Sequence, residues 1–170
     1  RPVAPAVSQT IKAPKTTQAP AQTQKAAAAN LANRPAREWA DKALQASLQG
    51  KYDEAVSYAE KVIQLKPDNA EDHAKAYFAR GLSLYKQGQQ TKAISDLDTA
   101  VNLCPGFLDA YVIRGNAKAE IGMYDKAIQD LDMAIKIKPD YGRAYSNRAY
   151  AYYKKEAYDE ALADSTRAIE

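Results

Sequence analysis

Three prolines, Pro67, Pro105 and Pro139, divide residues 36–170 into blocks of nearly equal length. Pro105 and Pro139 are 34 residues apart, whereas the first interval is 38 residues because it contains four extra residues, Ala70–His73. Proline cannot continue a helical hydrogen-bond ladder and disfavours a helical residue before it, so each proline is expected to end a helix. We expect Ala70–His73 to form a longer linker between helix pairs. The aligned blocks are 36–69, 74–107, 108–141 and an incomplete fourth, 142–170.

Aligned positions in these blocks carry the same kind of residue, and we call each such set of positions a column. Apolar residues recur at helical spacing from Trp39 onward, which predicts two helices per block. Small residues let paired helices approach closely, and glycine suits a left-handed turn after the first helix. The fourth block has Glu156 at this turn, which predicts a tighter or strained turn. The columns are aromatic (Trp39, Tyr77, Tyr111, Tyr145), small on the first helix (Ala43, Gly81, Gly115, Ala149), small on the second helix (Ala55, Ala93, Ala127, Ala161) and turn glycine (Gly50, Gly88, Gly122).

These columns and their period resemble those of the tetratricopeptide repeat family, and the resemblance covers residues 36–170. It implies an all-α fold, a right-handed α-solenoid of antiparallel helix hairpins with about four repeat units, the last of them incomplete. It also implies that the first helix of each hairpin lines a concave groove.

Two further columns carry opposite charges sixteen residues apart. They contain arginine (Arg80, Arg114, Arg148) and aspartate (Asp96, Asp130, Asp164). Block one has Lys42 and Tyr58 at these positions, so the two columns change together, as expected for residues in contact. The partner of each arginine lies either in the same repeat or in a neighbouring one. We interpret the columns as half-buried ion pairs that fix hairpin register rather than as a site for an acidic ligand.

Residues 1–35 have a different composition and are expected to form a flexible, basic tail or linker. They contain five of the eight prolines, are rich in Ala, Gln, Thr and Lys, and include no aromatic or acidic residue. Such a segment has too little apolar surface to offset the entropy lost on folding. It carries a charge of +5, so the net charge of +3 leaves −2 for residues 36–170. Nucleic-acid binding by the folded domain is therefore not expected.

The columns that line the expected groove are apolar and aromatic in the middle and charged at the edges. This composition suits a peptide or an amphipathic helix, and Asn116 and Asn147 can both donate to and accept from a peptide backbone. For any single residue, the alternative is packing against a neighbouring first helix. We predict a protein–protein interaction scaffold that binds a partner's peptide or amphipathic helix in its groove. The predicted binding residues are Phe78, Leu82, Tyr85, Val112, Asn116, Arg143, Asn147, Tyr150 and Tyr153.

A clamp for two carboxylates, as used by chaperone-binding members of the family, needs lysine and asparagine at set positions of consecutive first helices. The frame that contains Asn116 and Asn147 has Val112 in place of the lysine, so we do not expect a clamp. No catalytic residue, cofactor or metal site is predicted either. His73 and Cys104 are the single residues of their types and belong to no catalytic motif.

A second hypothesis is a structural one, in which the chain self-assembles as a homo-oligomer through its repeat ends or its groove. No stretch approaches the ~18 consecutive apolar residues of a membrane span. A single cysteine cannot form an internal disulfide, so cysteine usage does not define the compartment. The bacterial cell envelope, with the tail as a tether, and the cytoplasm are both compatible with the sequence.

Overall fold

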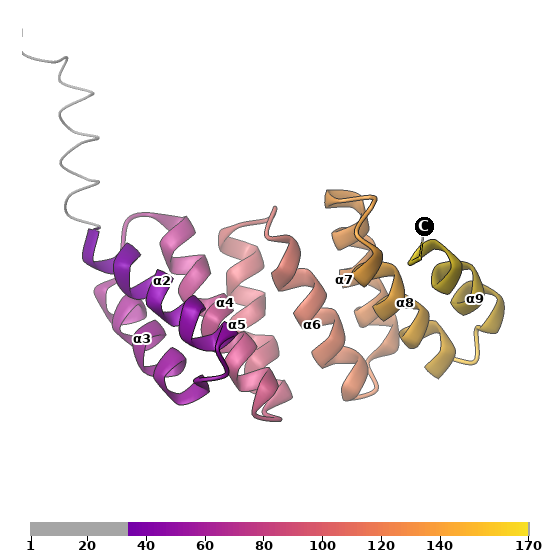
Figure 1. The fold of residues 1–170 in the computed structure, drawn as a ribbon, viewed down its shortest axis with the longest axis horizontal. Helices are drawn as coiled ribbons and strands as arrows, with labels where there is room; N and C mark the ends of the chain where they lie inside the picture. The colour runs from indigo at the N-terminus through magenta and orange to yellow at the C-terminus, as the bar shows by residue number, and fades with distance from the viewer. Residues whose placement is uncertain (1–33, 170) are drawn as a thin grey trace, which may run out of the picture. The chain divides into compact units, whose positions relative to one another are not determined.

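The structure, a computed structural model, describes residues 34–169, and residues 1–33 of the predicted tail lie outside the described residues. The described helices follow one another in four hairpins (Figure 1). This arrangement confirms the predicted all-α solenoid of helix hairpins. In pairs, the helices are α2 (Arg34–Leu48) with α3 (Tyr52–Leu65), α4 (Ala70–Lys86) with α5 (Gln90–Leu103), α6 (Leu108–Glu120) with α7 (Tyr124–Ile137), and α8 (Gly142–Lys154) with α9 (Tyr158–Arg167).

The first helices of neighbouring hairpins contact one another. Helix α2 contacts α4, α4 contacts α6, and α6 contacts α8, whereas each described second helix contacts only first helices. The first helices therefore form one continuous surface of residues 34–169, and the second helices form the opposite surface.

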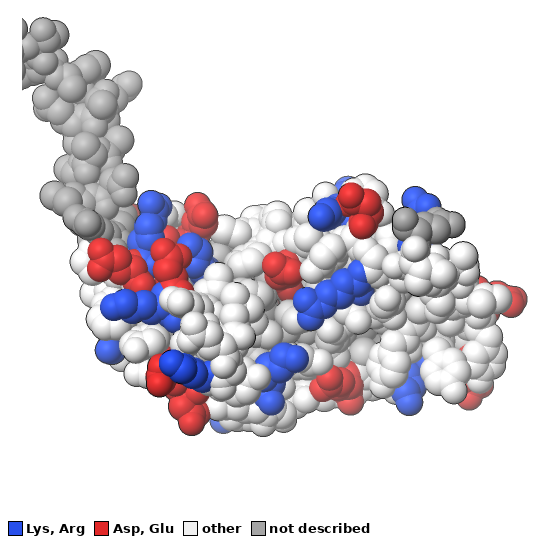
Figure 2. Space-filling view, viewed as in Figure 1, with Lys and Arg blue, Asp and Glu red and all other residues white. Residues whose placement is uncertain are grey.

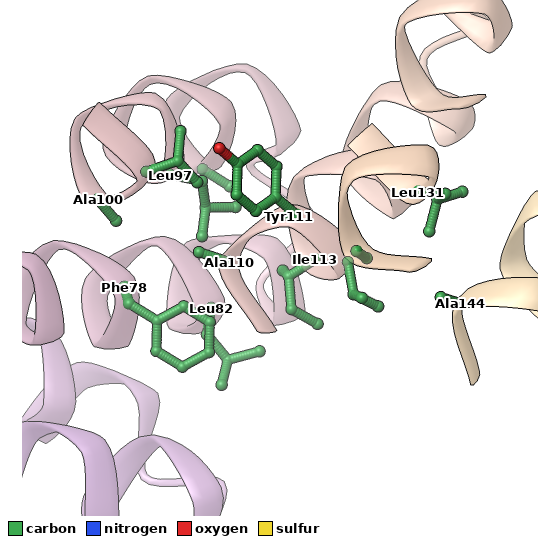
Figure 3. Packing of buried hydrophobic residues seen from close by; sticks show 13 residues of the cluster. Phe78, Leu82, Leu97, Ala100, Ala110, Tyr111, Ile113, Leu131 and Ala144 are labelled. Carbon is green, nitrogen blue, oxygen red and sulfur yellow. The ribbon is translucent and has the colours of Figure 1, made fainter. Parts of the chain in front are cut away.

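Two glycines allow the helices of the second and third hairpins to pack closely. A Cβ atom on Gly81 would lie 2.9 Å from Leu97 Cγ, and one on Gly115 would lie 3.0 Å from Leu131 Cγ. Because protein interiors are closely packed, a larger residue at either glycine would force the neighbouring leucine to move. Both leucines belong to one core cluster that extends from Phe78 on α4 to Ala144 on α8 (Figure 3).

The turn between the two helices of each hairpin has a left-handed residue. Its φ is +79° at Gly50, +77° at Gly88 and +80° at Gly122, and Glu156 adopts a φ of +63° at the same place. A residue with a Cβ is disfavoured in this region by about 1–2 kcal/mol. The turn at Glu156 therefore keeps the geometry of the others and is strained, as one of the two sequence-based alternatives predicted.

The expectation that Ala70–His73 form a linker is wrong, because α4 begins at Ala70 and is one turn longer than predicted. Asn69 caps this turn: its side-chain oxygen accepts a hydrogen bond from the Glu71 backbone N–H at 3.0 Å. The Asn69 amide also donates to the Asp72 carboxylate at 2.9 Å. A cap and two acidic residues stabilise a helix N-terminus, and Asp72, which is buried, also lies 3.5 Å from the Arg37 guanidinium on α2. The extra turn thus joins the first two hairpins.

Each predicted arginine–aspartate pair forms within its own repeat. The Arg80 guanidinium donates two hydrogen bonds to Asp96, at 2.7 and 2.8 Å, and Arg148 donates two to Asp164, each at 2.7 Å. Hydrogen bonding to the carboxylate is the main cause that raises the pKa of both arginines. The interpretation of these columns as half-buried ion pairs is confirmed.

Two of the arginines also reach back to the preceding repeat, where they bond a second aspartate that lies outside the predicted column. Arg114 pairs with Asp130 in its own repeat and donates to Asp98 on α5 at 2.7 Å. Arg148 likewise donates to Asp132 on α7 at 2.5 Å. Each of these arginines therefore connects three helices from two repeats.

The first repeat replaces this ion pair with aromatic stacking. Trp39 and Tyr58 stack with ring centroids 5.4 Å apart, and the Lys61 ammonium lies 4.1 Å from the centroid of the Trp39 ring. Lys42, which occupies the arginine column, also lies over Trp39 at 4.5 Å. A cation over an indole face is attracted by the ring quadrupole, so this cluster also joins α2 to α3.

We predict that Asp130→Ala lowers the free energy of unfolding by about 3 kcal/mol, because it leaves Arg114 and Lys118 without their buried carboxylate. Urea denaturation followed by circular dichroism measures the change. Asp132→Ala is the matched control, since Asp132 is half-exposed and its loss should cost less than about 1 kcal/mol. Equal effects of the two substitutions would contradict a structural role for the buried column.

Candidate functional site

A cavity of about 340 Å³ opens on the surface formed by the first helices. Its apolar wall comes from three of these helices, and the Phe78 and Phe107 rings pack at a centroid distance of 4.6 Å within it. Charged residues from α4, α6 and α8 lie at its edge. The lining residues are Leu44, Ser47, Leu48, Tyr52, Phe78, Leu82, Lys86, Phe107, Asp109, Ile113 and Arg143.

Only some of the predicted binding residues meet at this cavity. Phe78, Leu82 and Arg143 line it. Phe78 and Leu82 are also core residues, exposed by only 5% and 8%, so they shape the cavity floor and cannot be replaced by polar residues without disturbing the fold. Val112 is fully buried and has no surface to offer a ligand.

Tyr85 lies beside the cavity and connects α4 to α6. Its hydroxyl donates a hydrogen bond to Glu120 at 2.5 Å, and Gln90 donates to the other carboxylate oxygen at 2.6 Å. Burial raises the pKa of the Tyr85 phenol, and the hydrogen bond to Glu120 raises it further. Tyr85 is therefore a neutral donor engaged within the protein.

Tyr150 and Tyr153 lie elsewhere, in a shallow hollow between α8 and α9. Tyr153 packs against Tyr158 with ring centroids 5.8 Å apart. Asn116 is half-buried and does not line the cavity. The structure thus places Phe78, Leu82 and Arg143 at the cavity and Tyr150 and Tyr153 on a separate surface of the fourth repeat.

Asn147 on α8 is half-buried and holds an unpaired polar atom. Its side-chain nitrogen is enclosed, and no described residue accepts a hydrogen bond from it. Ala79 and Ile113 occupy the same column in the two preceding repeats and are buried and apolar, whereas the first repeat has Asp41 there. An enclosed donor without an acceptor lowers the stability of the fold.

Sequence reasoning missed Phe107, because this residue lies between Pro105 and α6, outside the helical period. It precedes the first residue of α6, and Tyr141 occupies the same position before α8. An aromatic residue repeated at this boundary is the signal that the sequence offered. Leu44, Leu48 and Ile113 also line the cavity without belonging to the predicted binding set.

The face drawn in Figure 2 carries separate basic and acidic groups, including a basic group near its middle, on a mainly uncharged surface. Within residues 34–169, no group of three or more His, Cys, Asp or Glu side chains is arranged to hold a metal ion. Burial raises the pKa of the Cys104 thiol and lowers that of His73. A raised thiol pKa disfavours the thiolate that nucleophilic chemistry requires.

None of the helices described is both long and apolar enough to cross a membrane.

The fold and its open cavity define a protein-interaction scaffold. A family model described as TPR repeat matches residues 115–156, and a model described as anaphase-promoting complex, cyclosome, subunit 3 matches residues 48–134. The chain belongs to the tetratricopeptide repeat family. No curated protein matches it.

Solved structures of similar proteins share this fold. The crystal structure of MamA is 27% identical with a TM-score of 0.66, and the match covers 87% of this chain and 81% of MamA. MamA from Desulfovibrio magneticus RS-1 is 22% identical with a TM-score of 0.68, over 77% of this chain and 72% of that one. YrrB, described as a TPR protein with an unusual peptide-binding site, is 26% identical with a TM-score of 0.64, over 73% of this chain and 62% of YrrB.

We predict that Asn147→Leu raises the free energy of unfolding by about 1 kcal/mol, because it removes an enclosed donor that lacks an acceptor. Asn116→Leu makes the same chemical change on α6, where no enclosed amide is unpaired, and should change stability by less than about 0.5 kcal/mol. Urea denaturation of both variants measures the difference. A loss of stability in Asn147→Leu would show that the amide supports the fold.

Proposed function

We propose that this chain is an interaction scaffold that binds a peptide segment of a partner protein in the groove formed by α2, α4, α6 and α8. The observation that supports this most directly is the open cavity of about 340 Å³, whose apolar wall spans three repeats. Cavities that bind ligands combine an apolar wall with a few polar groups at the edge. The peptide-binding site named for YrrB, a protein of the same fold, also supports a peptide as the ligand.

The exposed part of the cavity is the part that a partner can reach. Leu48 is 72% exposed at one end, and Lys86 and Arg143 are exposed at its edge. Burying Leu48 against a partner removes apolar surface from water, which stabilises the complex.

The test is a selection of binding peptides from a displayed random library on the immobilised domain. We expect enriched peptides whose affinity falls by about tenfold or more in a variant that carries Leu48→Ser, Lys86→Ser and Arg143→Ser, since a few residues of an interface usually supply most of its binding energy. The matched control carries Leu65→Ser, Lys126→Ser and Lys136→Ser on the second helices and should bind as the unmodified chain does. Lack of enrichment, or equal binding by both variants, would rule out the groove.

A second candidate function is self-association through the surface between α8 and α9. Leu162 is 69% exposed there, whereas Ile128, at the same position in the third repeat, is 9% exposed because α8 covers it. Tyr150, Tyr153 and Tyr158 are exposed on the same surface. Contiguous exposed apolar and aromatic residues are typical of interaction sites.

Light scattering over a dilution series tests self-association. If this surface pairs two copies, the mass should fall on dilution, and Leu162→Glu should give a monomer at every concentration because it places a charge in an apolar contact. Leu65→Glu on α3 is the control, since Leu65 is also exposed and lies on a different helix. A mass that does not change with concentration would exclude this function.

A further inference from the structure

The carboxylates around the groove already have donors within the protein. Asp41 accepts from the Lys75 ammonium at 2.7 Å, and Asp109 accepts from the Tyr141 hydroxyl at 3.2 Å. Glu120 accepts from both Tyr85 and Gln90. Of these carboxylates, only Asp41 is neutralised by a cation, whereas Asp109 and Glu120 have neutral donors and keep their negative charge.

On α4 and α8, three exposed basic residues have no carboxylate partner among the described residues. No described carboxylate lies within ion-pair distance of Lys86, Arg143 or Lys154, and all three are exposed. Lys86 and Lys154 lie over the rings of Tyr85 and Tyr150, at 5.6 and 5.5 Å. Along the groove, these three cations therefore outnumber Asp109 and Glu120, the two carboxylates whose donors are neutral. The local excess is positive although residues 36–170 have a net charge of −2, from +3 minus the +5 of the tail.

These cations are spread along the groove. Lys86 lies in the last turn of α4, Arg143 in the first turn of α8, and Lys154 in the last turn of α8. Arg143 and Lys154 are eleven residues apart on one helix, which corresponds to roughly 16 Å at the rise of an α-helix. One terminal carboxylate cannot contact both of them, so the arrangement fits acidic side chains distributed along a peptide rather than a chain end.

We propose that the groove selects an extended acidic peptide in which a large apolar side chain has carboxylates on both sides. The apolar side chain enters the cavity beside Leu44, Phe78 and Ile113, and the flanking carboxylates pair with Lys86 and Arg143 at its edge. This inference rests on the proposed function of the groove and adds the chemistry of the ligand. Charge complementarity of this kind contributes to specificity and to the association rate.

A nucleic acid would also be attracted by free cations, but the cavity offers it little. Single-stranded nucleic acids bind through bases that stack on exposed aromatic rings. The two aromatic rings that pack together in the cavity are those of Phe78, which is buried, and Phe107, which is half-buried. The apolar wall is suited to an aliphatic or aromatic side chain, so a peptide is the ligand that the site favours.

Fluorescence anisotropy with three labelled peptides of equal length tests the proposal on the full chain. The first has a central leucine flanked by glutamates, the second has lysines in place of the glutamates, and the third has serine in place of the leucine. We expect the first to bind about tenfold more tightly than either of the others, and its advantage over the lysine peptide to shrink as salt is added. An oligo-deoxythymidine is included as a competitor.

Two charge variants provide the internal control. Lys86→Glu with Arg143→Glu should reverse the preference between the glutamate and lysine peptides, whereas Lys126→Glu with Lys136→Glu on α7 should leave it unchanged. Circular dichroism checks that each variant is folded, and the milder pair Lys86→Gln with Arg143→Gln should abolish the preference if the reversed charges unfold the chain.

Several results would overturn the inference. Equal affinity for the glutamate and lysine peptides, a preference that survives the charge variants, or displacement of the peptide by oligo-deoxythymidine would each do so. In the first two cases the proposed function would stand if selected peptides still depend on Leu48, Lys86 and Arg143. Failure to select any peptide would instead count against the groove itself.

Discussion

The guanidinium of Arg114 connects three helices from two repeats, and the arrangement of the array depends on this kind of contact. It bonds Asp130 on α7 within its own hairpin and Asp98 on α5 in the preceding one. Because the guanidinium is planar and its donors point in fixed directions, it constrains orientation as well as distance. The same geometry recurs at Arg148. One type of contact therefore fixes the orientation of the third hairpin on the second and of the fourth on the third.

The fixed orientation of the hairpins also shapes the groove. The close approach at Gly81 and Gly115 lets α5 and α7 pack against α4 and α6, and Arg114 and Arg148 hold consecutive hairpins so that α4, α6 and α8 lie side by side. Leu44, Phe78 and Ile113, from three repeats, thereby surround one cavity. The ligand site is thus a property of the spacing between repeats rather than of any one repeat, and small changes in that spacing change its width.

The hairpins, their turns and the ion pairs could be predicted because each depends on residues that recur at a fixed period. The extra turn of α4 could not be predicted in this way. The repeat alignment starts this helix at residue 74, but the cap by Asn69 starts it at Ala70. Val112 and Ile113 look alike in the sequence, yet Val112 is fully enclosed while Ile113 reaches the cavity. The free charges of the groove were also unpredictable, since the engagement of Asp109 depends on Tyr141, which lies 32 residues away.

The extra turn of α4 also affects which hairpins dock on one another during folding. Repeats that resemble one another can dock with the wrong neighbour, and such misassembly is a characteristic failure of repeat proteins. The buried Asp72 meets Arg37 only when the second hairpin lies on the first, and among helices α3 to α9 only α4 begins with a side-chain cap. A hairpin docked out of order would bury that carboxylate without its cation, so this contact penalises shuffled arrangements and gives the array a defined beginning.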